Sequence, residues 1–390
     1  MTRMFDHDVA VVGGGPAGTS TALHLVREQG IRADRVLVID KACFPRDKPC
    51  AGAISQVGVD ALTALGLQVT VPFVQMRGVR VIAEGEVGET LCEMGIVVRR
   101  IEFDAQLVAD ARREGVEIRE GETLRAVDRI TGGFRLTTTS GATTTRLLAA
   151  CDGAGSTTRK LLGLREPERK GHLYVLETAP LPSDAGTSRG MIDFDLSVLE
   201  DGLQGYYWDF PTIIDGRPHV SRGIYHANLA PSSEVKATLG RALARRGIDI
   251  ARVKLRPFST RPYVRGSVID LEGGVLVGEA AGIDQTTGEG IAQAILMGGI
   301  AARHLTRALR TGGTSFAAYS RDVRVSTMGR HMLQGAWLAR RVYSPIGRPA
   351  RRLLLESSFA RDAAMRWYAG HSLPWSTKLK LGLSLLRRVA

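Results

Sequence analysis

At 390 residues, 44% of them hydrophobic, the chain is long and apolar enough for two packed domains, which excludes global disorder. Its 52 basic and 40 acidic residues give a net charge of +12, and residues 340–390, with eleven Lys or Arg against two acids, carry +9 of it. No nucleic-acid-binding motif accompanies these charges. No signal peptide is recognisable, and no apolar run approaches the roughly 18 residues of a membrane span. We therefore expect a cytoplasmic protein without a nucleic-acid partner.

The four cysteines, Cys43, Cys50, Cys92 and Cys151, form no Cys-x-x-Cys pair, and no histidine lies at metal-ligand spacing from them. We expect reduced thiols and no metal site.

The N-terminal segment has the pattern of a dinucleotide-binding unit. Residues 8–12 predict a strand, residues 16–28 a helix and residues 36–40 a second strand. The turn after the first strand matches Gly-x-Gly-x-x-Gly, which permits a tight turn, a close approach to a pyrophosphate and close packing of the helix. The residues predicted to contact the pyrophosphate are Gly13, Gly15, Pro16, Ala17 and Gly18.

Asp40 ends the second strand, where a carboxylate can accept hydrogen bonds from ribose hydroxyls. The acid favours an unphosphorylated ribose, as in FAD or NAD, and the adjoining Lys41 belongs to the same predicted site.

The next segments predict further helices and strands. Residues 55–65 predict a short helix capped by Ser55, and residues 103–114 predict another helix. Short alternating strands with glycine turns at residues 116–150 predict a small antiparallel insertion.

The second half of the chain divides into two regions. Residues 173–269 predict strands with one helix at 233–246, and they carry no nucleotide motif, so we assign them to a substrate domain. From residue 289 onward almost every segment predicts helix.

A second glycine-rich stretch at residues 278–291 follows the apolar run 275–277 and precedes a predicted helix. Its order is strand, tight turn and helix N-terminus, which is a second place where backbone N–H groups can hold an anionic group. Two such sites far apart in one chain indicate a large cofactor held at both ends, and FAD fits.

Several segments, in this order, resemble FAD enzymes of the para-hydroxybenzoate hydroxylase fold, and most of all the geranylgeranyl reductase family. They are the Pro-Arg-x-Lys-x-Cys stretch at 45–52, residues 100–104, the Asp-Gly segment at 151–159, the Tyr-x-Trp-x-Phe-Pro strand at 206–211 and Thr-Gly-Glu-Gly-Ile at 287–291. The resemblance covers roughly residues 5–310.

The resemblance implies an α/β (α+β composite) fold, with a Rossmann-like FAD-binding domain of the glutathione reductase/para-hydroxybenzoate hydroxylase type, an antiparallel substrate domain and a helical C-terminus. We divide the chain accordingly. The FAD-binding domain is predicted at 1–70, 99–165 and 262–312, the substrate domain at 71–98 and 166–261, and the helical basic region at 313–390.

The same resemblance implies further cofactor-binding residues: Arg46, Lys48, Cys50, Ala51, Gly52, Arg100, Asp152, Gly278, Glu279, Gly288, Gly290 and Ile291. The chain departs from the family at two of these residues, Ala51 and Glu279, and also in a nearby loop. Glu279 stands where the family has Asp, Ala51 replaces a glycine, and Gln285-Thr286 occupies the region of a loop proline.

Catalytic roles are predicted for Cys50 and for Gly288, Glu289 and Gly290. A helix N-terminus at 288–290 would direct backbone N–H groups at the flavin edge that is negative when reduced. Cys50 would donate a proton or shape the pocket; packing alone is the alternative.

Tyr206, Trp208 and Phe210 alternate, so on a strand they share one face. They would form either the aromatic wall of a hydrophobic substrate tunnel or an ordinary sheet core.

The predicted reaction is reduction of C=C bonds in a polyprenyl or related lipid-like substrate by hydride transfer from reduced flavin. The alternative is a flavin monooxygenase or halogenase of secondary metabolism. No second glycine-rich fold for NADPH is evident, so NAD(P)H, free reduced flavin and a ferredoxin remain open as electron donors.

Near the C-terminus, Trp375, Leu379, Leu383 and Leu386 share one helical face, and Lys380, Ser384, Arg387 and Arg388 share the other. Such a helix either lies on an anionic membrane surface, which would make the protein peripheral at the inner face of the membrane, or packs on the domain with a solvated basic face.

Overall fold

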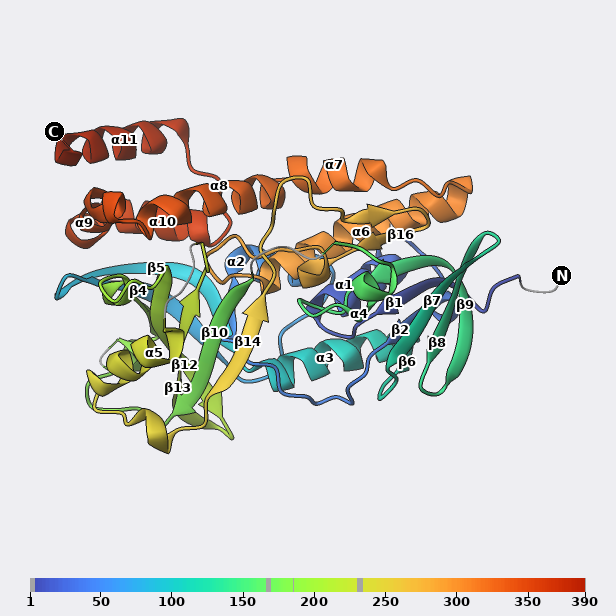
Figure 1. Ribbon diagram of the computed structural model, residues 1–390, viewed down its shortest axis with the longest axis horizontal. Coiled ribbons are helices and arrows are strands. Elements are labelled where there is room, and N and C mark those ends of the chain that lie inside the picture. The colour runs from blue at the N-terminus through green and yellow to red at the C-terminus, as the bar shows by residue number, and fades with distance from the viewer. Residues whose placement is uncertain (1–3, 166–169, 185, 230–233, 390) are drawn as a thin grey trace.

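The computed structural model describes residues 4–165, 170–184, 186–229 and 234–389. Over these residues the chain forms two eight-stranded sheets, A and B, side by side, and C-terminal helices lie along both (Figure 1).

Sheet A is the dinucleotide-binding sheet, with the strand order β15-β16-β9-β1-β2-β6. From β16 to β6 all neighbouring strands are parallel, and β7, β8 and the start of β9 form an antiparallel extension. Its strands are β1 (His7–Val12), β2 (Val36–Ile39), β6 (Glu117–Arg119), β7 (Leu124–Ile130), β8 (Gly133–Thr138), β9 (Gly141–Ala150), β15 (Asp270–Leu271) and β16 (Gly274–Leu276).

Both faces of sheet A are covered, because successive side chains of a strand point to opposite faces. Val9 and Val11 of β1 pack against helices α1 (Pro16–Arg27), α3 (Arg100–Arg113) and α6 (Ile291–Thr311). Ala10 and Val12 pack instead against the antiparallel strands through residues such as Phe134 and Leu136. This three-layer arrangement is the glutathione reductase type that was predicted.

Sheet B has the strand order β14-β10-β13-β12-β11-β4-β5-β3 and is antiparallel except between β11 and β4. Its strands are β3 (Ala53–Ser55), β4 (Phe73–Ala83), β5 (Glu86–Val98), β10 (Gly171–Thr178), β11 (Met191–Asp195), β12 (Gly205–Ile214), β13 (Arg217–His226) and β14 (Arg256–Thr260). Helix α5 (Val235–Ala244) covers one face through Leu239 and Leu243, and C-terminal helices cover the other.

The remaining helices are α2 (Gln56–Ala64), α4 (Thr157–Leu161), α7 (Ala317–Val325), α8 (Thr327–Val342), α9 (Arg348–Glu356), α10 (Ser358–Tyr368) and α11 (Trp375–Val389). Among the described residues, no helix has the length and apolar character needed to cross a membrane.

Most predicted elements are confirmed, with three corrections. Ser55 occupies the N-cap position of α2, but its side chain makes no capping hydrogen bond. Helix α3 begins at Arg100 instead of 103. Residues 116–150 do not form a purely antiparallel insertion, because β6 pairs in parallel with β2, and β9 pairs in parallel with β1 along most of its length. The helix predicted at 233–246 is α5, and Ser233 lies outside the described residues.

Candidate active site

A groove of about 430 Å³ lies at the carboxyl ends of β1, β2 and β9, where open α/β sheets bind ligands. It extends to sheet B at Leu173 and Phe258. The predicted cofactor residues that line it are Gly13, Gly15, Pro16, Ala17, Asp40, Lys41, Arg46, Lys48, Cys50, Arg100, Asp152, Glu279, Gly288, Gly290 and Ile291.

The other four predicted cofactor residues, Gly18, Ala51, Gly52 and Gly278, do not line the groove. The three glycines are needed for close packing. A Cβ at Gly18 would overlap the carbonyl oxygen of Gly13, and one at Gly52 would overlap that of Val98. Gly278 has a φ of +64°, and a Cβ there would lie 2.6 Å from Cβ of Ala17. They therefore shape the walls from behind.

The glycine turn presents the N-terminus of α1 to the groove. Gly13 has a φ of +110°, and a Cβ there would overlap the carbonyl oxygen of Cys151, so only glycine fits. The first-turn N–H groups of α1 have no intrahelical acceptor and carry the positive end of the helix dipole. This end of the groove is suited to a pyrophosphate.

Asp40 fixes the turn as well as lining the groove. Its Oδ2 accepts a hydrogen bond from the Gly14 N–H at 2.6 Å, and its Oδ1 accepts one from the Ala42 N–H at 2.8 Å. The carboxylate is thus positioned by backbone donors, with lone pairs left for a ribose.

Arg100 lies at the floor of the groove in a buried ion pair. Its Nε and Nη2 each donate to Asp104 at 2.7 Å, and Arg46 Nη1 lies 3.1 Å from the same carboxylate. Burial by itself lowers the pKa of Arg100, but the charge of Asp104 outweighs it and the pKa rises, so the guanidinium stays charged.

Lys48 links the two motif segments of the site. Its Nζ lies 3.1 Å from Oε2 of Glu279 and 4.5 Å from the centre of the Phe258 ring. The glutamate that replaces the family's aspartate is therefore the partner of a lysine on the opposite wall.

Asp152 holds the turn before α4. Its Oδ2 accepts hydrogen bonds from the Thr158 N–H at 2.8 Å and from the Thr158 hydroxyl at 2.9 Å. The neighbouring Gly155 lines the groove, and apart from Gly155 and its two chain neighbours no atom of the described residues lies within 4 Å of the position of an added Cβ. This wall therefore has room for a ligand.

The loop before α6 is organised around the buried Asp284. Its Oδ1 accepts from the N–H of Thr286 at 2.8 Å and from that of Gly288 at 3.2 Å, and its Oδ2 accepts from the hydroxyls of Tyr225 and Thr260. Burial raises the pKa of Asp284. Thr286 has a φ of +65°, which a proline cannot adopt, so the missing family proline has a structural reason.

Gly290 is the N-cap residue of α6, and Gly288 lies just before it with a φ of +78°. Both line the groove. Glu289, between them, points into the protein, where its Oε2 accepts from Nε2 of Gln285 at 3.0 Å and of Gln293 at 2.8 Å. Burial raises the pKa of Glu289 to about 7.

Cys50 lies on the groove wall and is half-buried. Its Sγ accepts a hydrogen bond from the Gly52 N–H at 3.4 Å. Of the other cysteines, Cys43 is exposed and Cys92 is half-buried on β5. Cys151 lines the groove but is buried, and burial raises the pKa of its thiol.

The aromatic side chains Tyr206, Trp208 and Phe210 share one face of β12, as predicted, but they do not line the groove. They pack under α9 and α10, in a cluster that includes Leu355 and Met365. Tyr206 makes the contact with the site, since its hydroxyl donates to the carbonyl oxygen of Thr287 at 2.7 Å.

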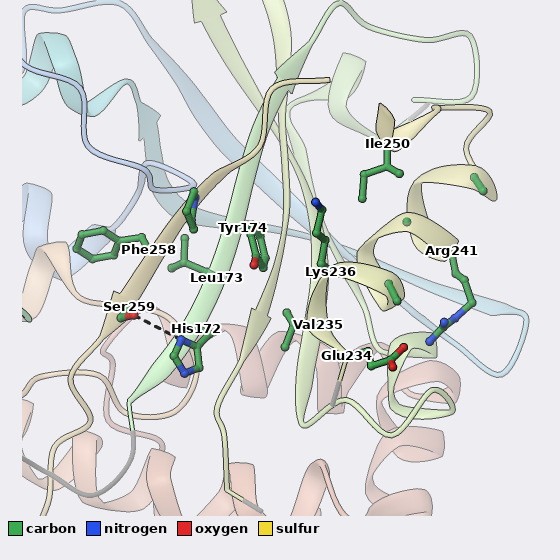
Figure 2. A pocket seen from close by; sticks show the side chains of 14 residues that line it. His172, Leu173, Tyr174, Glu234, Val235, Lys236, Arg241, Ile250, Phe258 and Ser259 are labelled. Carbon is green, nitrogen blue, oxygen red and sulfur yellow. Dashed lines mark hydrogen bonds between the residues drawn. The ribbon is translucent and has the colours of Figure 1, made fainter. Parts of the chain in front are cut away.

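A second, more open hollow of about 1180 Å³ lies between α5 and the β10–β14 edge of sheet B (Figure 2). Leu173 and Phe258 line both this hollow and the groove, so the two are separated only by these strands.

Sequence reasoning missed the groove residues that belong to no motif, such as Thr123 and Leu124 of the β7 region and Leu173, Phe258 and Thr260 of sheet B. Only the three-dimensional packing of the two sheets brings them to the site.

Comparisons with known proteins agree with this geometry. The FAD binding domain family matches residues 6–190. Menaquinone reductase of Mycobacterium tuberculosis is 30% identical over 323 residues, which cover 76% of this chain and 76% of the relative. A geranylgeranyl bacteriochlorophyll reductase-like protein from Thermoplasma acidophilum has a TM-score of 0.77 at 20% identity, covering 97% of this chain and 99% of that one.

The chain belongs to a family of FAD-dependent oxidoreductases that includes menaquinone reductase of Mycobacterium tuberculosis. The fold of this family extends to other chemistry. The flavin-dependent brominase Bmp2 has a TM-score of 0.70 at 18% identity, with 98% of each chain covered.

The residues of this reductase-family site suit FAD, the cofactor of the family. The α1 N-terminus would hold the pyrophosphate, Asp40 the ribose, and the 288–290 turn the ring system. Bound there, FAD would supply the redox chemistry. The chain supplies the fixed positive ends of two helices, the Arg100 and Lys48 cations, and the Cys50 thiol on the groove wall.

Proposed function

We propose that this enzyme reduces isolated C=C bonds in a polyprenyl or related lipid-like substrate. The observation that carries the proposal is the contact between β12 and the loop before α6. Through the Tyr206 hydroxyl and Thr287, the aromatic face of β12 is joined to the loop whose glycines line the cofactor groove. A Cβ at Gly288 would lie 2.6 Å from the Tyr206 hydroxyl, so the two elements are in close contact.

Such a reaction adds a hydride to one carbon and a proton to the other. A dry, apolar surrounding favours it, because it excludes water and strengthens local electrostatics. The aromatic cluster packs behind the loop and keeps water from that side of it, with the rings of Phe194 and Tyr206 5.0 Å apart and those of Tyr206 and Tyr225 5.7 Å apart. The Cys50 Sγ is our candidate for holding the proton.

The relative named menaquinone reductase supports this substrate class, because menaquinones carry a polyprenyl chain. Because the brominase has the same fold, an oxygen-dependent monooxygenase or halogenase reaction is the alternative function.

The test uses FAD-loaded protein reduced with dithionite under anaerobic conditions, with a polyprenyl menaquinone and geranylgeraniol as probes and mass spectrometry as the readout. We expect products that have gained two hydrogens at a double bond. Products that form only with oxygen, and that contain an added oxygen or halogen atom, would overturn the proposal. Replacing dithionite by NADPH, free reduced flavin or ferredoxin would identify the donor.

Cys50→Ala tests the proton step, with Cys43→Ala as a matched control because Cys43 is exposed. We expect Cys50→Ala to slow product formation while FAD content is retained. Unchanged turnover in Cys50→Ala would remove Cys50 as the proton donor.

A further inference from the structure

Helix α11 exposes an apolar stripe to solvent. Trp375 is 78% exposed, Leu379 56%, Leu383 50% and Leu386 66%. In Figure 1 the helix lies as the outermost layer of the C-terminal region, on the side of α9 and α10. Four large apolar side chains in one row on a single surface helix mark an interaction site, because isolated exposed residues are normal but rows are not.

The stripe points away from the protein. At about 100° per residue, the four side chains fall within an arc of about 80°. The less exposed residues Thr377, Leu381 and Leu385 fall on the opposite side of the helix. That side is also where Arg388 reaches Glu356 at the end of α9, at 2.8 Å. Helix α11 is therefore apolar on two sides, and only one of them is used by the fold.

Two residues of the predicted polar face, Ser384 and Arg388, lie toward the domain. Ser384 is half-buried, and Arg388 pairs with Glu356 on the inner side. The helix therefore packs on the domain through one side and exposes its apolar row on the other.

Cations border the exposed stripe. Lys380 and Arg387 flank it along one edge and Lys378 along the other, and α11 contains no Asp or Glu. Lys380 Nζ lies 4.1 Å from the centre of the Phe359 ring, so its position beside the stripe is fixed by α10. Residues 340–390 carry a net charge of +9.

We propose that α11 docks lengthwise on the surface of a bilayer that contains anionic lipids. The leucines and Trp375 would enter the boundary between headgroups and acyl chains, and the bordering cations would meet the lipid phosphates and carboxylates. A second copy of the chain suits this face less well. A two-fold contact through the stripe would place the bordering cations of the two helices against each other with no acid in either helix.

This inference does not depend on the proposed function, because no residue of α11 lines the groove. The test measures flotation of the full-length, FAD-loaded protein with vesicles of phosphatidylcholine alone and with vesicles that also contain phosphatidylglycerol. We expect binding to the anionic vesicles, weakened by salt, and little binding to the neutral ones.

The key variant is Leu379→Glu/Leu383→Glu, in which both altered residues are exposed. We expect its binding to anionic vesicles to fall at least about tenfold, because apolar burial and charge attraction are both reduced. FAD content and turnover of a short, water-soluble substrate should stay unchanged.

Leu91→Glu is the matched control. Leu91 is 76% exposed on β5, and its neighbours Thr90 and Cys92 face α10 and the cluster beneath it, so Leu91 points away from these helices. Equal binding by the double variant and the wild type would overturn the proposal. Absence of vesicle binding by the wild type would overturn it as well. If the wild type then formed dimers in solution and the double variant did not, the partner would be a second copy of the chain.

Discussion

Glu289 offers the sharpest test of the site, because a carboxyl group is buried one residue from the glycines that line the groove. Burial raises its pKa from the ordinary 4.5 to about 7, although Gln293 and Gln285 donate hydrogen bonds to it. Because the pKa is higher in the folded chain than in the unfolded chain, Glu289 holds a proton in the folded state that it has lost in the unfolded state at any pH between the two pKa values. Its contribution to stability is therefore present below about pH 4.5 and is lost as the pH rises through about 7.

The magnitude follows from this interval. Each pH unit within it changes the free energy of unfolding by up to about 1.4 kcal/mol, so the full change is about 3 kcal/mol. Glu289→Gln removes the titration and keeps the size and the hydrogen-bonding capacity of the side chain. Between pH 5 and pH 8, we expect the stability of the variant relative to the wild type to rise by about 2–3 kcal/mol.

The assay is urea unfolding of FAD-loaded protein at several pH values, followed by tryptophan fluorescence. Glu86→Gln is the control, since Glu86 is exposed at the start of β5. Subtracting each variant from the wild type cancels the other buried acids, including Asp193, whose pKa burial also raises to about 7. If the free energies of unfolding of Glu289→Gln and the wild type change in parallel between pH 5 and pH 8, the buried, protonated state of Glu289 is refuted.

Three further perturbations test the groove and the contacts that support it. Gly13→Ala should abolish FAD retention, because its Cβ would overlap the Cys151 carbonyl oxygen. The control is Gly240→Ala on α5, where an added Cβ would make only ordinary van der Waals contacts. This control should retain FAD, as judged by the absorbance of bound flavin. Lys48→Met should weaken FAD binding about tenfold, because it leaves Glu279 without its cation. In fluorescence titrations of FAD, Lys48→Met/Glu279→Gln should recover part of this loss, and an equal loss of affinity in both variants would contradict the coupling of Lys48 and Glu279. Tyr206→Phe should lower the free energy of unfolding by about 1 kcal/mol through loss of its hydrogen bond to Thr287, and an unchanged melting temperature would count against that bond.

The parts of the site that sequence could predict are those whose backbone geometry requires a particular residue. Gly13 and Gly288 have left-handed φ values, and Gly18 tolerates no side chain, so their places are visible as glycines in a pattern. The pair formed by Arg100 and Asp104 was also readable, because residues four apart on a helix are neighbours, once α3 is taken to begin at Arg100.

Other features depend on packing that no local pattern records. Leu173 and Phe258 are ordinary strand residues until sheet B meets sheet A. The period of α11 revealed which residues share a face but not which face the protein uses, because both sides of the helix carry leucines. Contacts with α9 and α10 decide which side of α11 faces the protein. These helices are near α11 in the sequence and in space, but no sequence motif records their contacts.

The C-terminal helices, which carry no family motif, also connect the two proposals. Helix α11 packs on α9, and α9 and α10 place Leu355 and Met365 against the aromatic face of β12. Tyr206 on that face reaches the loop whose glycines line the groove. One continuous apolar cluster of α9, α10 and β12 thus lies between α11 and the loop of the groove, and we expect a lipid-like substrate to approach from the side of α11. The effect of Leu379→Glu/Leu383→Glu on turnover should therefore depend on the substrate. The variant should lose turnover of a polyprenyl substrate presented in anionic vesicles and keep turnover of a short soluble substrate. Equal loss of turnover with both substrates would contradict a link between membrane docking and the reaction.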